Sequence, residues 1–305
     1  MTASLAIDDP VLESFAAEIE GADPITIVGR RTAWDRGGAL EGTPREVSAP
    51  SGIVAYAPEE MTVTVRAGTP VAELDEALTA ANQRCALPDR GGTVGGAVSV
   101  GENDPLVLGK GRLRASVLQV RYVSADGRLI TGGGPTVKNV TGFDLPRLMT
   151  GALGTLGFLA EVILRTNPIP AAATWFRSDD ADPFATFDAL LHPSAVFWDG
   201  TTTWVLLEGH LVDVAAEAAV LASTGAFTET DGPPPLPPHR WSLTPGELRT
   251  LGLDHYVASI GVGTVFATEP QRDRMIDPAA REVSSRLKTL FDPTGRLNPG
   301  RERSH

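Results

Sequence analysis

Three segments of the chain combine glycine with hydroxyl or basic side chains, and the second and third contain several closely spaced glycines. They are Gly29-Arg30-Arg31-Thr32, residues 91–101 and residues 151–157. Glycines at this density predict a backbone that approaches another bulky group closely. Any one segment is explained as well by a turn. Because successive backbone N–H groups in such loops form concave anion sites, the ordered set favours a ligand with phosphate groups.

The order of the glycines excludes two common nucleotide-binding motifs. A Rossmann fingerprint needs a strand, then Gly-x-Gly-x-x-Gly, then a helix. Here Gly151, Gly154 and Gly157 have a different spacing, and a predicted strand follows them. A phosphate-binding Walker loop needs Gly-Lys-Ser or Gly-Lys-Thr, which the sequence lacks. We therefore do not expect nicotinamide or ATP binding of these two types.

Apolar patterns predict the elements that position the glycine segments. A strand at residues 25–28 leads into the first segment, and a strand at residues 158–165 follows the third. Residues 61–68 alternate as a strand does, and Thr69 and Pro70 then predict the N-cap and first position of a helix. Further predicted elements are helices over residues 1–20, 71–81 and 144–150, a strand at 53–57, and a hairpin joining strands 116–123 and 129–131.

The character of the sequence changes at Asn167-Pro168-Ile169-Pro170, which predicts a domain boundary. Residues 1–167 are expected to form one domain and residues 168–305 a second. The second domain is predicted to contain strands at 204–209 and 257–266 and a helix at 212–223. It ends with a helix at 278–291 and a closing tail at 292–300, Asp-Pro-Thr-Gly-Arg-Leu-Asn-Pro-Gly.

Composition and charge exclude several classes of function. The 305 residues carry a formal net charge of −12, which argues against broad nucleic-acid or anionic-membrane binding. The single cysteine, Cys85, excludes an internal disulfide and a cysteine-ligated iron–sulfur cluster. The first residues lack a basic region followed by an apolar run, so we expect no leader peptide, and no apolar run approaches the roughly 18 residues that span a bilayer. We expect a cytoplasmic protein whose membrane association, if any, comes through partners.

The order and content of these segments resemble the FAD-binding domain of the vanillyl-alcohol oxidase and p-cresol methylhydroxylase (PCMH) superfamily. The resemblance covers residues 25–167 well and, beyond them, only about the last ten residues. Within the superfamily, the chain most resembles the FAD-binding subunits of glycolate oxidase. The matching pieces are residues 61–78, Gly92-Thr93-Val94-Gly95-Gly96, residues 137–145 (Val-Lys-Asn-Val-Thr-Gly-Phe-Asp-Leu), residues 151–157 and the closing tail.

The resemblance implies an α+β fold, with a PCMH-type two-lobed FAD-binding domain followed by a shortened α+β cap domain. FAD would extend between a small α/β lobe and a larger antiparallel-sheet lobe. The first segment would hold the pyrophosphate, the second would follow the phosphates and the flavin edge, and the third would lie close by. The implied cofactor-binding residues are Gly29, Arg30, Arg31, Thr32, Gly92, Thr93, Val94, Gly95, Gly96, Ser99, Lys138, Asn139, Gly142, Gly154, Thr155 and Gly157.

Two features depart from the family pattern. The first segment carries Arg30 where relatives have small residues, so its guanidinium either obstructs close approach of the phosphates or pairs with them. Many relatives attach flavin covalently through a histidine in a glycine loop. All five histidines of this chain lie beyond residue 191. We therefore expect non-covalent FAD.

The resemblance implies a subunit that takes part in oxidation of a small 2-hydroxy acid such as glycolate. Its partners would be a catalytic flavoprotein subunit and an iron–sulfur subunit of a hetero-oligomeric oxidase. The sequence contains no His-x-His run that would hold a metal or serve as a base, so it predicts no metal site and assigns no catalytic residue. Two alternatives remain open: a stand-alone FAD-dependent 2-hydroxy acid dehydrogenase, and a scaffold subunit that has lost its flavin.

Overall fold

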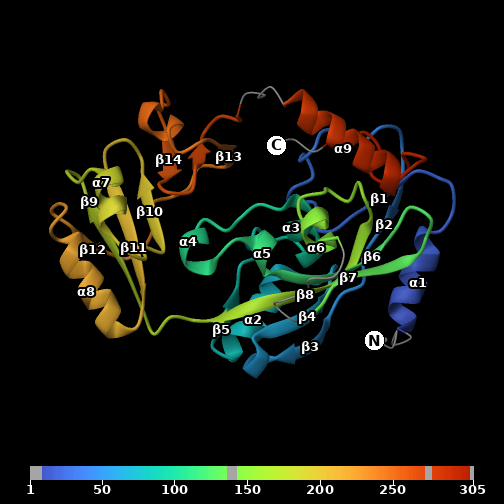
Figure 1. Cartoon of the computed structure of the whole chain (residues 1–305), viewed down its shortest axis with the longest axis horizontal. Coiled ribbons are helices and arrows are strands. Elements are labelled where there is room, and N and C mark those ends of the chain that lie inside the picture. Colours follow the sequence, from blue (N-terminus) through green and yellow to red (C-terminus); the bar gives the residue numbers. More distant parts are fainter. Residues whose placement is uncertain (1–8, 136–142, 272–276, 303–305) are drawn as a thin grey trace. The chain divides into compact units, whose positions relative to one another are not determined.

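The computed structural model describes residues 9–135, 143–271 and 277–302. The chain divides into two compact units (Figure 1). Unit 1 comprises Met1–Asp104, Leu113–Asn167 and Met275–His305. Unit 2 comprises Pro105–Arg112 and Pro168–Arg274, so it is inserted in the sequence of unit 1.

This division differs from the predicted domains 1–167 and 168–305 in two segments. The closing tail belongs to unit 1 because Asn298 and Arg296 hydrogen-bond to residues near the N-terminus. Residues 105–112 belong to unit 2, where Gly109 packs against Ser194. The resemblance of the closing tail to the FAD-binding family was a sign of the first difference, whereas the local sequence gives no sign of the second. Whether the two units act as cofactor and cap domains stays a prediction.

The main sheet of unit 1 is built around one long buried strand, β8 (Phe158–Pro168). Its strand order is β3-β4-β8-β6-β7, with β5 also paired to β8. The pairs β3–β4, β4–β8, β6–β8 and β6–β7 are antiparallel. The other strands are β3 (Ile53–Ala57), β4 (Thr62–Arg66), β5 (Gln83–Cys85), β6 (Val117–Val123) and β7 (Leu129–Gly133). The predicted strands and the predicted hairpin are thus confirmed.

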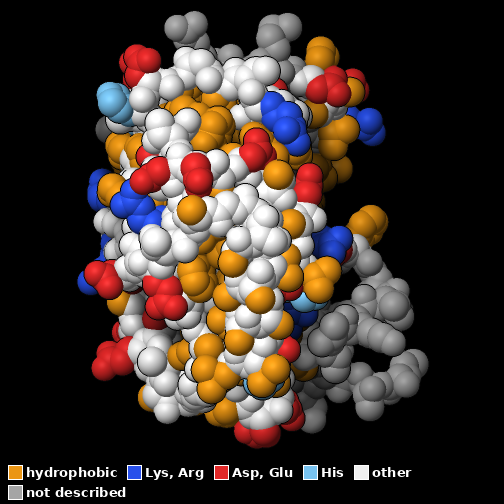
Figure 2. Space-filling model, turned by 90° about the vertical axis from the view of Figure 1, so that its left-hand side faces the viewer, with side chains coloured by type: hydrophobic (Ala, Val, Ile, Leu, Met, Phe, Trp, Pro, Cys, Tyr) orange, Lys and Arg blue, Asp and Glu red, His pale blue; other side chains and the backbone are white. Residues whose placement is uncertain are grey.

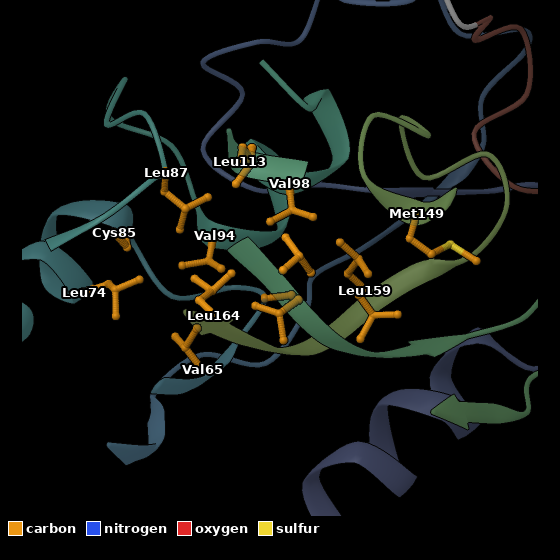
Figure 3. Packing of buried hydrophobic residues seen from close by; sticks show 14 of the residues in the cluster. Val65, Leu74, Cys85, Leu87, Val94, Val98, Leu113, Met149, Leu159 and Leu164 are labelled. Carbon is orange, nitrogen blue, oxygen red and sulfur yellow. The ribbon is translucent and has the colours of Figure 1, made fainter. Parts of the chain in front are cut away.

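The core of unit 1 lies between this sheet and the helices that cover it (Figure 3). Val65 and Leu164, on neighbouring strands, are fully buried together with Leu74 and Val98 from two helices. The helices of the unit are α1 (Pro10–Ile19), α2 (Val71–Ala80), α3 (Val94–Val100), α5 (Leu113–Ser116), α6 (Leu145–Met149), α9 (Pro278–Phe291) and the 3-10 helix η1 (Pro58–Glu60).

The start of α2 differs from the prediction by one residue. Pro70 occupies the N-cap, and the Thr69 side chain does not cap the helix. Instead the Thr69 hydroxyl accepts a hydrogen bond from the backbone N–H of Gly52 at 2.8 Å. The hydroxyl therefore fastens the helix to a neighbouring loop rather than to its own first turn.

A second, smaller layer of unit 1 joins the two ends of the described chain. Strands β1 (Ile25–Ile27) and β2 (Arg45–Val47) are parallel, and Leu297 of the closing tail forms a parallel bridge with Ile25. The guanidinium of Arg296, almost fully buried, donates to the carbonyls of Ile19 and Ala125. The tail is therefore a structural part of this layer.

A buried cluster of charges connects helix α1 to the main sheet. Arg66 on β4 pairs with Glu161 on β8 at 2.7 Å and with Asp9, which caps the N-terminus of α1. Arg121 on β6 lies 3.5 Å from the other oxygen of Glu161. Because removal of one partner would leave another charge buried without compensation, loss of any one of these side chains should destabilise unit 1.

Unit 2 is a sheet of seven strands with strand order β12-β9-β11-β10-β14-β15-β13. The predicted single strand at 257–266 is wrong. It consists of β14 and β15, separated by a turn in which Gly261 and Gly263 have positive φ. The elements are α4 (Val107–Lys110), β9 (Ala172–Ser178), α7 (Pro183–Ala189), β10 (Ala195–Trp198), β11 (Thr203–Gly209), α8 (Leu211–Leu221), β12 (Thr228–Thr230), β13 (His239–Ser242), η2 (Glu247–Thr250), β14 (Tyr256–Ser259) and β15 (Thr264–Ala267).

Helix α8 of unit 2 has an apolar outer face. Leu211 and Val212 are 73% and 79% exposed, and Val220 is also exposed. Figure 2 shows hydrophobic side chains gathered on the side of the molecule that carries this helix. No helix in the described ranges is long and apolar enough to cross a bilayer.

Candidate functional site

The first and second glycine segments lie against each other in unit 1. A Cβ atom added to Gly29 would stand 2.8 Å from Oγ1 of Thr93, and one added to Gly92 would stand 2.9 Å from Oγ1 of Thr32. The two segments can therefore pack this closely only because both positions are glycine. The structure brings together four residues predicted from separate parts of the sequence.

The second segment is a helix where a loop was expected. Helix α3 begins after Thr93, whose hydroxyl accepts a hydrogen bond from the Gly96 N–H at 3.2 Å. It ends at Gly101, whose φ of 73° suits a glycine C-cap. Gly95 is buried against Ala67, where a Cβ would come within 2.7 Å of the alanine methyl. Caps and a buried contact thus overcome the low helix propensity of glycine.

The third segment packs against the C-terminal turn of α3. The N–H of Gly151 donates to the Val98 carbonyl and the N–H of Leu153 donates to the Ser99 carbonyl, both at 2.9 Å. Ser99, predicted to contact the cofactor, thus also supports the third segment through its backbone. The three glycine segments therefore form one continuous set of contacts.

Protein atoms already occupy the space beside two glycines of the third segment. A Cβ on Gly154 would stand 2.6 Å from Nδ2 of Asn298, and one on Gly157 would meet the Tyr122 ring. The hydroxyl of Thr155 donates to the Ala152 carbonyl at 2.7 Å. Close packing within the chain therefore accounts for these glycines, and their predicted contact with a cofactor stays a prediction.

Arginines gather around the first segment although the chain as a whole is acidic. Trp34 has the guanidinium groups of Arg31 and Arg301 at 4.6 and 4.7 Å from its ring. Arg36 and Arg90 pair with opposite oxygens of Glu102 at 2.8 and 3.3 Å. These contacts fix several positive charges beside a loop predicted to hold phosphates.

The two arginines of the first segment have different surroundings. Arg31 adopts a φ of 58° and donates to both carboxylate oxygens of Glu46 at 2.7 Å. Its charge is therefore partly used within the protein. Arg30 is exposed and forms no ion pair with any residue between positions 9 and 135, 143 and 271, or 277 and 302. Of the two, Arg30 has the freer guanidinium.

Three predicted residues, Lys138, Asn139 and Gly142, lie outside the described residues. The structure adds Trp34 and Arg301 to the neighbourhood of the first segment, and burial lowers the pKa of Arg301. The closing tail resembles the family in sequence, but none of its residues was predicted to belong to the site. The position of Arg301 directly after this tail was the one sequence feature that could have indicated its place near the site.

The described arrangement fits a diphosphate-bearing cofactor. The glycines let the three segments pack closely on one another, and fixed guanidinium groups beside them favour negative charge. Among the described residues, no group of three His, Cys, Asp or Glu side chains could hold a metal ion. The chemistry of the donors thus suits phosphate oxygens.

Comparison with known proteins agrees with this assignment. Residues 16–133 match a family model described as an FAD binding domain. The structure resembles that of alkyldihydroxyacetonephosphate synthase with a TM-score of 0.67 and 13% identity, over 96% of this chain and 74% of the other. At that identity the likeness concerns the fold alone. The chain carries an FAD-binding domain of the PCMH type, in an α+β fold.

Two relatives of known name indicate which kind of FAD-binding protein the chain resembles. The glycolate oxidase subunit GlcE of Escherichia coli is 28% identical over 95% of this chain and 96% of its own length. The D-lactate dehydrogenase of Archaeoglobus fulgidus is 35% identical over 33% of this chain and 24% of its own length. The chain therefore resembles glycolate oxidase subunit GlcE along almost its whole length, with an FAD binding domain matched at residues 16–133.

Proposed function

We propose that the chain binds FAD non-covalently and serves as the FAD-binding subunit of a glycolate-oxidase-like complex. The complex would oxidise a small 2-hydroxy acid such as glycolate. The observation that carries the proposal is the contact among the three glycine segments beside fixed arginines, in a chain that matches GlcE along almost its whole length. Bound FAD would supply the capacity to accept a hydride from the α-carbon.

The residues of the chain would act by binding and orienting the cofactor. Gly29 and Gly92 would hold the first and second segments together beside the diphosphate, and Arg30 would pair with it. Arg31 and Arg301 would hold Trp34 in one orientation at the edge of the site. We assign no catalytic residue, because the four internal histidines all belong to unit 2 and are scattered along its sequence.

Two further observations support the idea that the chain binds partner subunits. The single cysteine cannot hold an iron–sulfur cluster, so electrons from the flavin would leave through another subunit. The apolar outer face of α8 resembles surfaces that bind other proteins. We propose a catalytic flavoprotein subunit and an iron–sulfur subunit as these partners.

Purification of the chain with and without its partners tests the proposal. We expect a flavin spectrum, and acid precipitation should release the flavin into the supernatant because no bond holds it. Flavin that stays in the pellet would contradict non-covalent binding. A colourless protein that also fails to take up added FAD would favour the scaffold alternative.

Addition of glycolate or lactate then separates the remaining alternatives. We expect slow or no bleaching of the flavin in the isolated chain and rapid bleaching in the assembled complex. Rapid bleaching by the isolated chain would instead identify a stand-alone dehydrogenase.

A further inference from the structure

A pocket of about 240 Å³ lies in unit 1 between the third glycine segment and helix α9. Two sides of that segment are closed, since Gly154 faces Asn298 and Gly157 faces Tyr122. Its remaining side, at Ala152, Thr155 and Leu156, opens into this pocket. The opposite wall belongs to α9 and to the residues after the closing tail.

The floor of the pocket is fixed by Lys288. Its ammonium group donates to the Thr155 carbonyl at 3.0 Å, the Asp292 carboxylate at 2.6 Å and the Leu297 carbonyl at 2.9 Å. Three acceptors use all three N–H groups of a lysine. Lys288 therefore holds α9 and the third segment together and is not available to a ligand.

Free donors in the pocket come from other lining residues. Arg281 of α9 is exposed, and its side chain forms no ion pair with the described part of the chain. Arg301 stacks on Trp34 and lies near the charge of Asp35. Within the described ranges its guanidinium donates one hydrogen bond, to the Arg36 carbonyl, so further N–H groups in the guanidinium plane can donate to a ligand. Ser284 and Ser285 add hydroxyl groups from the same face of α9.

We propose that this pocket binds the phosphate group of a ligand through Arg281 and Arg301, with Ser284 and Ser285 as further donors. Guanidinium and hydroxyl donors suit tetrahedral oxyanions, and arginine binds them with paired hydrogen bonds. The volume is smaller than the roughly 300–1,000 Å³ of pockets that enclose drug-sized ligands, which suits a phosphate-bearing end. The phosphate could come from the diphosphate of FAD or from a separate phosphorylated compound.

One lining residue carries a negative charge, so its replacement provides a second test of phosphate binding. Glu302 also lines the pocket, and its carboxylate would repel a phosphate. Its backbone N–H donates to the Gly37 carbonyl, so replacement of the side chain leaves the local backbone contact intact. Glu302→Gln should tighten phosphate binding, whereas Arg281→Gln should weaken it.

Calorimetric titration of the full chain with inorganic pyrophosphate, after removal of flavin, tests both directions. We expect Arg281→Gln to weaken binding about tenfold, as for loss of a charge-assisted hydrogen bond. We expect Glu302→Gln to strengthen it a few-fold. Arg286→Gln is the matched control, because Arg286 is exposed on the same helix but does not line the pocket. Each variant is first checked for a wild-type circular dichroism spectrum.

Equal pyrophosphate binding in the wild type, Arg281→Gln and Glu302→Gln would overturn the proposal, as would a lack of binding to the wild type. A second titration of the flavin-loaded chain identifies the source of the phosphate. If bound FAD abolishes pyrophosphate binding and Arg281→Gln also lowers FAD affinity, the ligand is the cofactor's diphosphate. If the loaded chain binds pyrophosphate as the apoprotein does, the ligand is separate.

Discussion

Asn298 lies against Gly154, and the two residues together fix the third glycine segment. The Asn298 amide donates to the Leu153 carbonyl at 2.6 Å, while its oxygen accepts from Thr26 Oγ1 at 2.7 Å and from the Ile27 N–H at 3.1 Å. A single side chain thus joins the strand before the first segment to the third. The candidate cofactor site is built on this connection.

We predict that Gly154→Ala destabilises the protein more than Gly42→Ala. Both glycines have a φ of 67°, but a methyl group on Gly154 would collide with Asn298, whereas Gly42 has no atom within 4 Å. The shared backbone strain should cost about 1 kcal/mol in each variant, and the collision should add about 1–3 kcal/mol in Gly154→Ala only. Urea unfolding of both variants measures the difference. Equal losses would mean that the Asn298 contact is not tight.

We predict that Asp9→Asn loses stability in a pH-dependent manner. Burial raises the pKa of Asp9, but hydrogen bonds from Arg66 and from the backbone N–H groups of Leu12 and Val11, with the Arg66 charge, hold it below 3.8. The carboxylate therefore contributes stability above pH 3.8 that disappears as the pH falls through the lower value in the folded protein.

The expected loss in Asp9→Asn is about 1.5–3 kcal/mol near neutral pH, the range for a hydrogen bond to a charged group. The difference from the wild type should shrink as the pH falls below 3.8. Urea unfolding at several pH values measures it. Glu13→Gln, exposed on the same helix, should show little loss at any of them. A loss in Asp9→Asn that does not vary with pH would point to packing rather than charge.

We predict that Arg30→Gln lowers FAD affinity about tenfold, because a charge-assisted contact to the diphosphate is lost. Flavin fluorescence during titration of the apoprotein measures the dissociation constant. The effect should diminish at high salt, as expected for an exposed charge. Arg128→Gln, in the exposed hairpin turn of unit 1, is the control. A rise in affinity would show that Arg30 obstructs the cofactor instead.

We predict that Val212→Glu reduces co-purification with the partner subunits at least several-fold. The side chain is 79% exposed on the apolar face of α8, so the substitution should leave the fold intact and place a charge in an apolar interface. Val283→Glu, 56% exposed on α9, is the control. If both variants retain their partners equally, α8 is not part of the interface.

Regular alternation and apolar spacing were sufficient to predict much of the fold. Strand β4 alternates cleanly, and α9 begins and ends at the predicted residues. Helix α3 was missed because its glycines have low helix propensity, although Thr93 and Gly101 were readable as caps. The turn between β14 and β15 was missed because apolar residues continue on both sides of it. Only Gly261 and Gly263, which have positive φ, mark the turn in the sequence.

The segments that form the candidate site were easier to predict than the contacts between residues far apart in the sequence. Glycine beside hydroxyl or basic side chains marked all three segments. The contact between Trp34 and Arg301, in contrast, depends on the return of the closing tail to unit 1, which no local pattern encodes. For the same reason the roles of Asn298 and Lys288 could not be predicted from their neighbours in the sequence.

The hydrogen bond between Thr26 and Asn298 joins residues 272 positions apart and has a consequence for synthesis on the ribosome. Unit 2 is translated before the residues that complete unit 1, so it can fold while β1 still lacks its neighbour Leu297. Contacts of such long sequence separation also form slowly. The apolar face of α8 would therefore form before the candidate cofactor site of unit 1 is complete.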